Sequence, residues 1–208
     1  MLLSDLANRH SGETVWVTGS GRSLSFIDAG FFDDKVTVAV NLSARLHGFT
    51  PTYLFSHYHE VTSTNLDADS IAVTLEYDTL KDKRWENPPD NVCFYPHESH
   101  TPAGEGWDPY TRPPLDGSLV YGSSSLHGAM HLAAHVGAKF IILVGADCGT
   151  LDGEHRIDDY PDGNKPWHIY EQHNRRMKQW LKERYGCEVY SLNPFLNFNL
   201  EGHKFEGV

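Results

Sequence analysis

Short apolar runs recur along the chain, and the segments between them carry apolar residues at helical spacing. The runs are rich in valine, isoleucine and other apolar residues, and they predict strands at 15–18, 35–40, 52–55, 70–75, 92–95, 140–144 and 188–192. A strand with so few polar residues is buried on both faces, which is typical of a parallel sheet.

Four intervening segments predict helices, at 3–10, 42–47, 124–136 and 169–185, and 23–32 predicts a short helix or turn. Gly137 and Gly186 follow the two longest segments and suit the residue at which a helix stops. Because strands and helices alternate, we predict an α/β fold with a doubly wound, mostly parallel, Rossmann-like sheet and helices on both faces. Ligands of such sheets bind outside the carboxyl ends of the strands.

The length of 208 residues suits one domain, and we predict a single nucleotide-binding domain over 1–208. Three stretches rich in proline, glycine, aspartate and charge, at about 76–91, 96–118 and 148–166, predict long surface loops. Loops of this length in a compact domain are often functional lids or binding loops.

Composition and charge argue against several classes of protein. The hydrophobic content of 39% argues against disorder, and the formal net charge of −11 argues against a protein that grips a long nucleic acid. Three widely spaced cysteines without a CxxC pair fit neither a disulfide framework nor a zinc ribbon. We find no apolar core of a signal peptide and no membrane span, so we predict a cytoplasmic protein; a homo-oligomer stays open.

The first candidate for ligand binding is the glycine loop after the first strand, formed by Gly19, Ser20, Gly21, Arg22 and Ser23. Two glycines let the main chain turn tightly and approach a ligand, and the amides of Gly21 to Ser23 can then point at phosphate oxygens. The loop is neither a complete GxGxxG nor a Walker motif. A plain tight turn is the alternative interpretation.

Further candidates follow other strands or begin a helix. Asn41 follows the second strand and also has N-cap chemistry for 42–47; Ser56 ends the third strand. Ser124 and Ser125 begin the helix at 124–136, where they either cap the helix or contact a phosphate or ribose. Gly145 and Asp147 follow the most apolar strand, and the Asp147 carboxylate suits a ribose hydroxyl, a magnesium ion, an acceptor hydroxyl or a loop cap.

Histidines give one candidate for catalysis. His168 opens the long helix after a loop, where an imidazole that titrates near neutral pH suits a general base. The alternative is a structural or surface histidine. His127, His131 and His135 share one helical stripe without an HExxH frame, and we interpret them as a solvated face or an interface.

Four segments carry a resemblance to a known family: VWVTGSGRSLSFID (15–28), VTVAVNLS (36–43), SSLHGAMHLAAHVGAKFIILVGADC (124–148) and HIYEQHNRRMKQWLKERYGCEVYSLNP (168–194). In this order they resemble the bacterial sialyltransferases that make host-like outer-core sugars. They also resemble the wider superfamily that includes 6-hydroxymethylpterin diphosphokinase-like proteins. The third segment is the most specific, and residues 60–120 match nothing in that pattern.

The resemblance implies roles for the candidates. It places a donor phosphate on Gly19, Gly21 and Ser23 and on the serines Ser124 and Ser125. It places the cytidine nucleotide near Asn41 and Gly145, and it makes His168 the base that activates an acceptor hydroxyl. Ser56 stands where the family has a second donor-binding asparagine, which is a departure from the pattern.

We therefore predict a nucleotide-sugar-dependent glycosyltransferase, sialyltransferase-like, that takes a CMP-sugar and a small or glycan acceptor and requires no cofactor. One alternative is a diphosphokinase of the pterin type, which needs magnesium and ATP. The metal would lie at Asp147 or in the acidic loop at 152–162, and Arg22 would serve in place of a phosphate-loop lysine. The other is a nucleotide-binding relative without catalysis.

Overall fold

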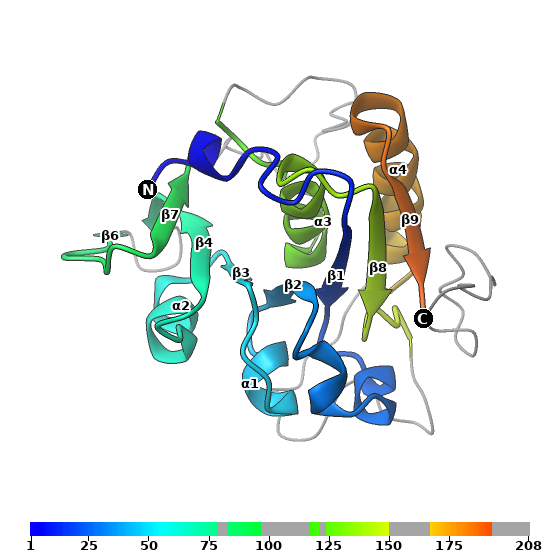
Figure 1. Ribbon diagram of the computed structural model, residues 1–208, viewed down its shortest axis with the longest axis horizontal. Helices are drawn as coiled ribbons and strands as arrows, with labels where there is room; N and C mark the ends of the chain where they lie inside the picture. Colours follow the sequence, from blue (N-terminus) through cyan, green and yellow to red (C-terminus); the bar gives the residue numbers. More distant parts are fainter. Residues whose placement is uncertain (79–82, 97–116, 121–123, 150–166, 193–208) are drawn as a thin grey trace.

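A parallel sheet forms the centre of the molecule. The computed structural model describes residues 1–78, 83–96, 117–120, 124–149 and 167–192. The sheet has seven strands in the order β7-β4-β3-β2-β1-β8-β9, and all of its pairs are parallel (Figure 1). Its strands are β1 (Thr14–Thr18), β2 (Val36–Val40), β3 (Tyr53–Ser56), β4 (Ile71–Leu75), β7 (Val92–Tyr95), β8 (Phe140–Val144) and β9 (Glu188–Ser191).

The strand order creates a reversal beside β1. From β1 the chain builds outward through β2, β3, β4 and β7, and it then returns to place β8 on the other side of β1. Val17 pairs with Val38 of β2 and with Leu143 of β8, so β1 lies inside the sheet between these two strands. This arrangement confirms the predicted doubly wound α/β fold, and the reversal marks the place where such sheets bind ligands.

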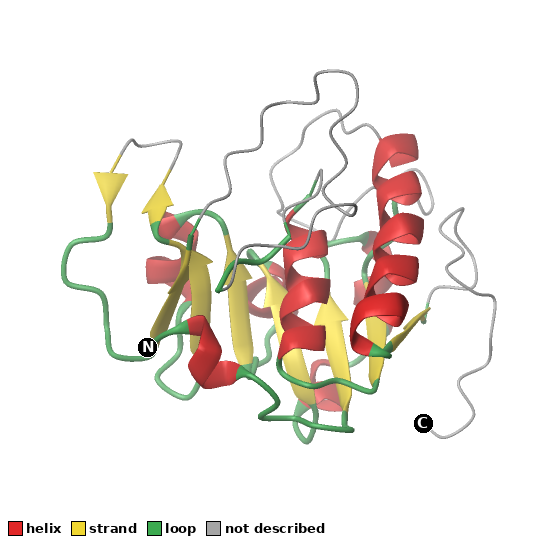
Figure 2. Ribbon diagram, turned by 90° about the horizontal axis from the view of Figure 1, so that it is seen from above, coloured by secondary structure: helices red, strands yellow, loops and turns green. Residues whose placement is uncertain are grey.

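Helices cover both faces of the sheet. On one face, α3 (Ser125–His135) and α4 (Trp167–Tyr185) lie side by side (Figure 2), together with the 3₁₀ helix η1 (Leu3–Leu6). On the other face lie η2 (Arg22–Phe26), η3 (Ala29–Phe32), α1 (Ser43–His47) and α2 (His59–Asn65). Because residues alternate along each strand, β1 contributes Val15 and Val17 to the first core and Trp16 to the second.

Two elements were not predicted from the sequence. The helix α2 begins at His59, and two residues separate it from the end of β3 at Ser56. The predicted loop at 76–91 contains a short antiparallel pair, β5 (Tyr77–Asp78) with β6 (Lys83–Arg84). Both are short and lack the sustained periodicity on which sequence interpretation depends.

The solvated-face interpretation of the histidine stripe on α3 is wrong, because two of its three histidines are buried. His127 and His131 are 0% and 1% exposed, because the stripe packs against α4 rather than facing water. His131 accepts a hydrogen bond from the Val120 amide at 2.7 Å, and its Nε2 lies 2.6 Å from the Tyr185 hydroxyl of α4. Within the described ranges, no three histidine, cysteine or acidic side chains are grouped to hold a metal.

Candidate functional site

The glycine loop after β1 packs directly against the turn after β8. The Gly19 amide donates to the Val144 carbonyl and the Gly21 amide to the Gly145 carbonyl, each at 2.7 Å. A Cβ on Gly19 would lie 2.5 Å from the Gly145 oxygen, and a Cβ on Gly21 would lie 2.6 Å from that oxygen and from the Asp147 carboxylate. Glycine is required here because two main-chain segments and a carboxylate approach too closely for any side chain.

The Asp147 carboxylate holds the end of the glycine loop. The Ser23 amide donates to Asp147 Oδ2 at 2.8 Å, the Ser23 hydroxyl donates to Oδ1, and Asp147 is 3% exposed. The structure thus corrects the expectation that the amides of Gly21 and Ser23 point at a phosphate, because both are donated within the protein. The Ser20 amide has no acceptor among the described residues and stays available to a ligand.

The same hydrogen bonds decide how well Asp147 could bind magnesium, as one form of the diphosphokinase alternative requires. A carboxylate binds Mg²⁺ through oxygen lone pairs directed at the ion. Both oxygens of Asp147 already accept hydrogen bonds from Ser23, so this arrangement fits a magnesium ligand poorly. Asp147 fits better as the anchor that joins the glycine loop to β8.

Asn41 and Ser56 meet at the carboxyl ends of neighbouring strands. Asn41 has the left-handed φ of 53°, which asparagine tolerates better than most residues. Its Oδ1 accepts from the Ser56 hydroxyl at 2.9 Å, and Ser56 Oγ accepts from the Tyr58 amide at 3.1 Å. The predicted N-cap role of Asn41 is wrong: α1 begins after Leu42 without a side-chain cap, since the Asn41 side chain bonds across the strands instead.

The N-terminus of α3, which carries Ser124 and Ser125, lies at the same edge of the sheet. Gly128 packs on Phe55 of β3, because a Cβ at Gly128 would lie 2.4 Å from the Phe55 ring. One helical turn back from Gly128 is about 6 Å, which matches roughly two residues of strand. Ser124 therefore lies near the level of His57, just beyond β3.

The two halves of the expected phosphate site thus flank one edge from opposite faces. The glycine loop leads into η2, whose Leu24 packs in the core on the α1 face. The helix α3 packs in the core on the other face, and it ends at the amino edge, where Gly137 accepts a hydrogen bond from Gly12. Its beginning is therefore at the carboxyl edge, and phosphate binding there stays a prediction.

Buried polar side chains join α3, α4 and the turn after β8 behind this edge. The Ser124 amide donates to His127 Nδ1 at 3.3 Å, and Asn174 Nδ2 of α4 donates to Cys148 Sγ at 3.2 Å. Burial, with the nearby His173, lowers the pKa of His127 to about 3, although the Asn174 side chain acts in the opposite direction. His127 is therefore neutral near pH 7, and it holds the first turn of α3 in place as a hydrogen-bond acceptor.

Cys148 follows Asp147 and carries no nucleophilic character in this environment. Burial raises the pKa of its thiol to about 12, while the hydrogen bond from Asn174 acts in the opposite direction. Because the thiolate is the nucleophilic form, a thiol that stays protonated near neutral pH is inert. Its φ of 47° places it in the tight turn that presents Asp147 to the glycine loop.

Sequence interpretation missed a buried histidine–tyrosine pair at this edge. His57 Nδ1 lies 2.8 Å from the Tyr95 hydroxyl; His57 directly follows β3, and Tyr95 is the last residue of β7. The Tyr95 ring stacks on Phe55 with centroids 5.8 Å apart. The signal was present, since each residue stands at the end of an apolar run, but only the sheet order shows that the two strands flank β4 on opposite sides.

His168, the predicted base, lies in the first turn of α4, and its side chain falls outside the described residues. Asn174 contacts Cys148 six residues later, so position 168 lies about 9 Å further along the helix axis at 1.5 Å per residue. The predicted loops at 96–118 and 148–166 fall largely outside the described residues, as do Asn193 and Pro194. The role of His168 stays a prediction.

Comparison with known proteins gives a structural likeness alone. Neither a protein-family model nor a curated protein matches the chain. The fold is similar to that of the MAf glycosyltransferase from Magnetospirillum magneticum AMB-1, with a TM-score of 0.55 and 15% sequence identity over 91% of this chain. The chain spans 35% of the length of that protein. No helix in the described part of the chain is both long and apolar enough to cross a bilayer.

Proposed function

We propose that the protein is a nucleotide-sugar-dependent glycosyltransferase whose donor binds at the carboxyl edge beside β1 and β8. The observation that carries the proposal is the position of this edge. The reversal of strand order and the glycine loop at 19–23 lie there, and the N-terminus of α3 lies at the same carboxyl edge, near the end of β3. Doubly wound sheets bind nucleotides at such a reversal, and the MAf glycosyltransferase provides a glycosyltransferase of similar fold.

The described residues supply donors for a phosphate from two faces. The Ser20 amide and the Arg22 side chain belong to the loop, and the hydroxyls of Ser124 and Ser125 begin α3, where the helix dipole favours an anion. Such oriented donors stabilise the negative charge that develops on a departing nucleotide. Asn41, Ser56 and Gly145 form the adjoining wall for the nucleoside.

The finer assignments follow the resemblance to bacterial sialyltransferases. In this proposal the donor is a CMP-sugar, and His168 takes the proton from the acceptor hydroxyl as that oxygen attacks the anomeric carbon. The bond from the anomeric carbon to the phosphate oxygen breaks, and CMP leaves. The acceptor is a small molecule or a glycan.

The test is a melting-temperature screen with CMP, UDP, GDP and ATP compounds, with and without magnesium, followed by an assay for hydrolysis of CMP-sialic acid. A ligand at a hundredfold excess over its dissociation constant raises the free energy of unfolding by about 2.7 kcal/mol. We expect the largest shift with a cytidine nucleotide and no dependence on magnesium. Stabilisation by ATP only with magnesium would favour the diphosphokinase alternative.

Variants separate binding from catalysis. His168→Ala should keep the nucleotide shift and lose turnover, whereas the double variant Ser124→Ala, Ser125→Ala should lose most of the shift. His135→Ala is the matched control, because His135 lies at the opposite end of α3 and should change neither. A wild-type protein that binds nucleotide without any turnover would point to the non-catalytic alternative.

A further inference from the structure

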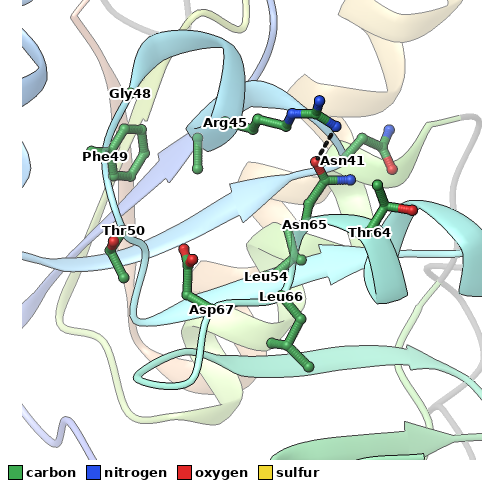
Figure 3. A pocket seen from close by; sticks show the side chains of 11 residues that line it. Asn41, Arg45, Gly48, Phe49, Thr50, Leu54, Thr64, Asn65, Leu66 and Asp67 are labelled. Carbon is green, nitrogen blue, oxygen red and sulfur yellow. Dashed lines mark hydrogen bonds between the residues drawn. The ribbon is translucent and has the colours of Figure 1, made fainter.

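A pocket of about 270 Å³ lies between α1 and α2 on the face opposite α3 (Figure 3). Arg45 of α1 donates through Nη1 to Asn65 Oδ1 of α2 at 3.2 Å, which joins the two walls. Asn41 lines the pocket as well, so the pocket adjoins the carboxyl edge where we place the donor. Its volume is just below the range of about 300–1,000 Å³ found for drug-sized ligands, and it suits one ring.

The floor of the pocket is apolar. Leu54 of β3 and Ala44 of α1 contribute buried side chains, and Leu66 lines the rim after α2. Phe49 is held rigid beside them, because its ring stacks on Phe32 with centroids 4.5 Å apart. A rigid apolar surface of this size matches the C–H face of a sugar ring.

The walls carry donors and acceptors on opposite sides. Figure 3 shows Asp67 and Thr50 on one side and Arg45, Asn65 and Asn41 on the other. The Asp67 carboxylate and the Thr50 hydroxyl receive no hydrogen bond from the described residues. On the opposite side, Arg45 uses one of its five N–H donors within the described part of the chain. The charges of Arg45 and Asp67 cancel, which favours a neutral ligand with hydroxyls at both ends.

We propose that this pocket binds a single neutral sugar ring and is the acceptor subsite, with sugar hydroxyls that donate to Asp67 and accept from Arg45 and Asn41. Sugar binding depends on the pocket alone, whereas its assignment as an acceptor subsite rests on the proposed glycosyltransferase function. Hydroxyl groups fit because each one both donates and accepts, so it can use either wall.

The experiment is saturation-transfer difference NMR on the whole chain with methyl glycosides of glucose, galactose and mannose, and with glucuronate as the charged comparator. We expect saturation transfer to at least one neutral glycoside. Thr64→Trp, which fills the pocket from an exposed position on α2, should abolish that signal. Its matched control is Ser63→Trp on the same helix. The Ser63 hydroxyl donates to the same Glu60 carbonyl as the Thr64 hydroxyl, but Ser63 does not line the pocket. The control should keep the signal.

A second pair tests the chemistry rather than the volume. Asp67→Asn should weaken binding about tenfold, the size of one hydrogen bond to a charged group. Asp69→Asn makes the same change two residues away at an exposed position outside the pocket, and it should change nothing. Absence of saturation transfer to any neutral glycoside would overturn the proposal, as would an equal signal in Thr64→Trp and the wild type.

Melting shifts with nucleotides on the same variants separate this proposal from the proposed function. Thr64→Trp should keep the nucleotide shift of the wild type while losing the sugar signal. Sugar binding without any nucleotide shift would overturn the glycosyltransferase proposal and leave the pocket assignment standing. A nucleotide shift without sugar binding would do the reverse.

Discussion

Two regions beside the sheet, the junction after β1 and β8 and the pocket between α1 and α2, use similar residues in opposite ways. At the junction, Gly19 and Gly21 let main-chain segments meet, and the buried Asp147 accepts hydrogen bonds from Ser23. In the pocket, Gly48 has no atom within 4 Å of an added Cβ, and Asp67 is exposed. A glycine or an aspartate just after a strand or a helix does not by itself indicate packing or binding; its tertiary neighbours decide between the two.

Acid should lower the stability of the protein through the buried His127, which lies behind the junction. The pKa of His127 falls from 6.5 to about 3 on folding, chiefly through burial, so the folded state resists a proton that the unfolded state accepts. The stability that this histidine contributes is present above pH 6.5 and is lost as the pH falls toward 3. At pH 4.5 the loss is on the order of 3 kcal/mol for this one group, because each pH unit below 6.5 costs about 1.4 kcal/mol. Urea unfolding between pH 7 and 4.5 measures it.

A second histidine on the same helix provides the control for this prediction. His127→Gln should flatten the pH dependence, whereas His135→Gln, at a partly exposed position of the same helix, should flatten it less. NMR titration of the His127 ring gives a direct check that does not depend on either variant folding. A midpoint near pH 6.5 would contradict the buried position of this ring.

Glycine substitutions compare the two regions through the free energy of unfolding, with expected losses of up to about 1–3 kcal/mol. Gly19→Ala should reduce the free energy of unfolding by roughly that amount, because the new Cβ would lie 2.5 Å from a main-chain oxygen. Gly48→Ala should cost about 1 kcal/mol through its left-handed φ of 87° alone. Gly30→Ala, whose Cβ would meet only the Asp33 carboxylate at 3.6 Å, should cost least. Denaturant midpoints rank the three, and equal losses at Gly19 and Gly30 would refute the close packing.

Thiol reactivity is the smallest expected effect. The pKa of Cys148 is raised to about 12 by burial, and burial also raises the pKa of Cys93 to about 11 and of Cys187 to about 12. All three should therefore react with iodoacetamide at pH 8 far more slowly in the native protein than after denaturation. Mass spectrometry of the alkylated peptides measures the rates. Rapid native labelling of Cys148 would show that the turn beside Asp147 opens.

The regular elements were predictable because their signals are local. Each predicted strand of the sheet appears within one or two residues of its predicted bounds, since a buried strand needs a continuous apolar run. The helix at 59–65 was not predicted, because only two residues separate it from β3. Four of its seven residues also have hydroxyl or amide side chains, so it lacks an apolar periodicity. The burial of the histidine stripe was not predicted because periodicity identifies a helix face without showing what covers that face.

The candidate site was predictable in position but not in detail. Glycines and small polar residues after strands identified the carboxyl edge, because all parallel strands end there. The partners were not predictable: Ser23 and Asp147 are separated by 124 residues, and nothing local assigns one to the other. The same holds for His57 with Tyr95, whose pairing depends on the order of three strands.

The sequence by itself determined the α/β alternation and the edge at which function is expected, because apolar periodicity and glycine placement are properties of neighbouring residues. Only the tertiary structure decided that Gly21 and Ser23 donate their amides inside the protein and that His127 is buried against α4. It also decided that a polar pocket lies between α1 and α2. The physical reason is that hydrogen bonds and burial depend on which distant segments meet, and the strand order together with the packing of helices on the sheet decides this.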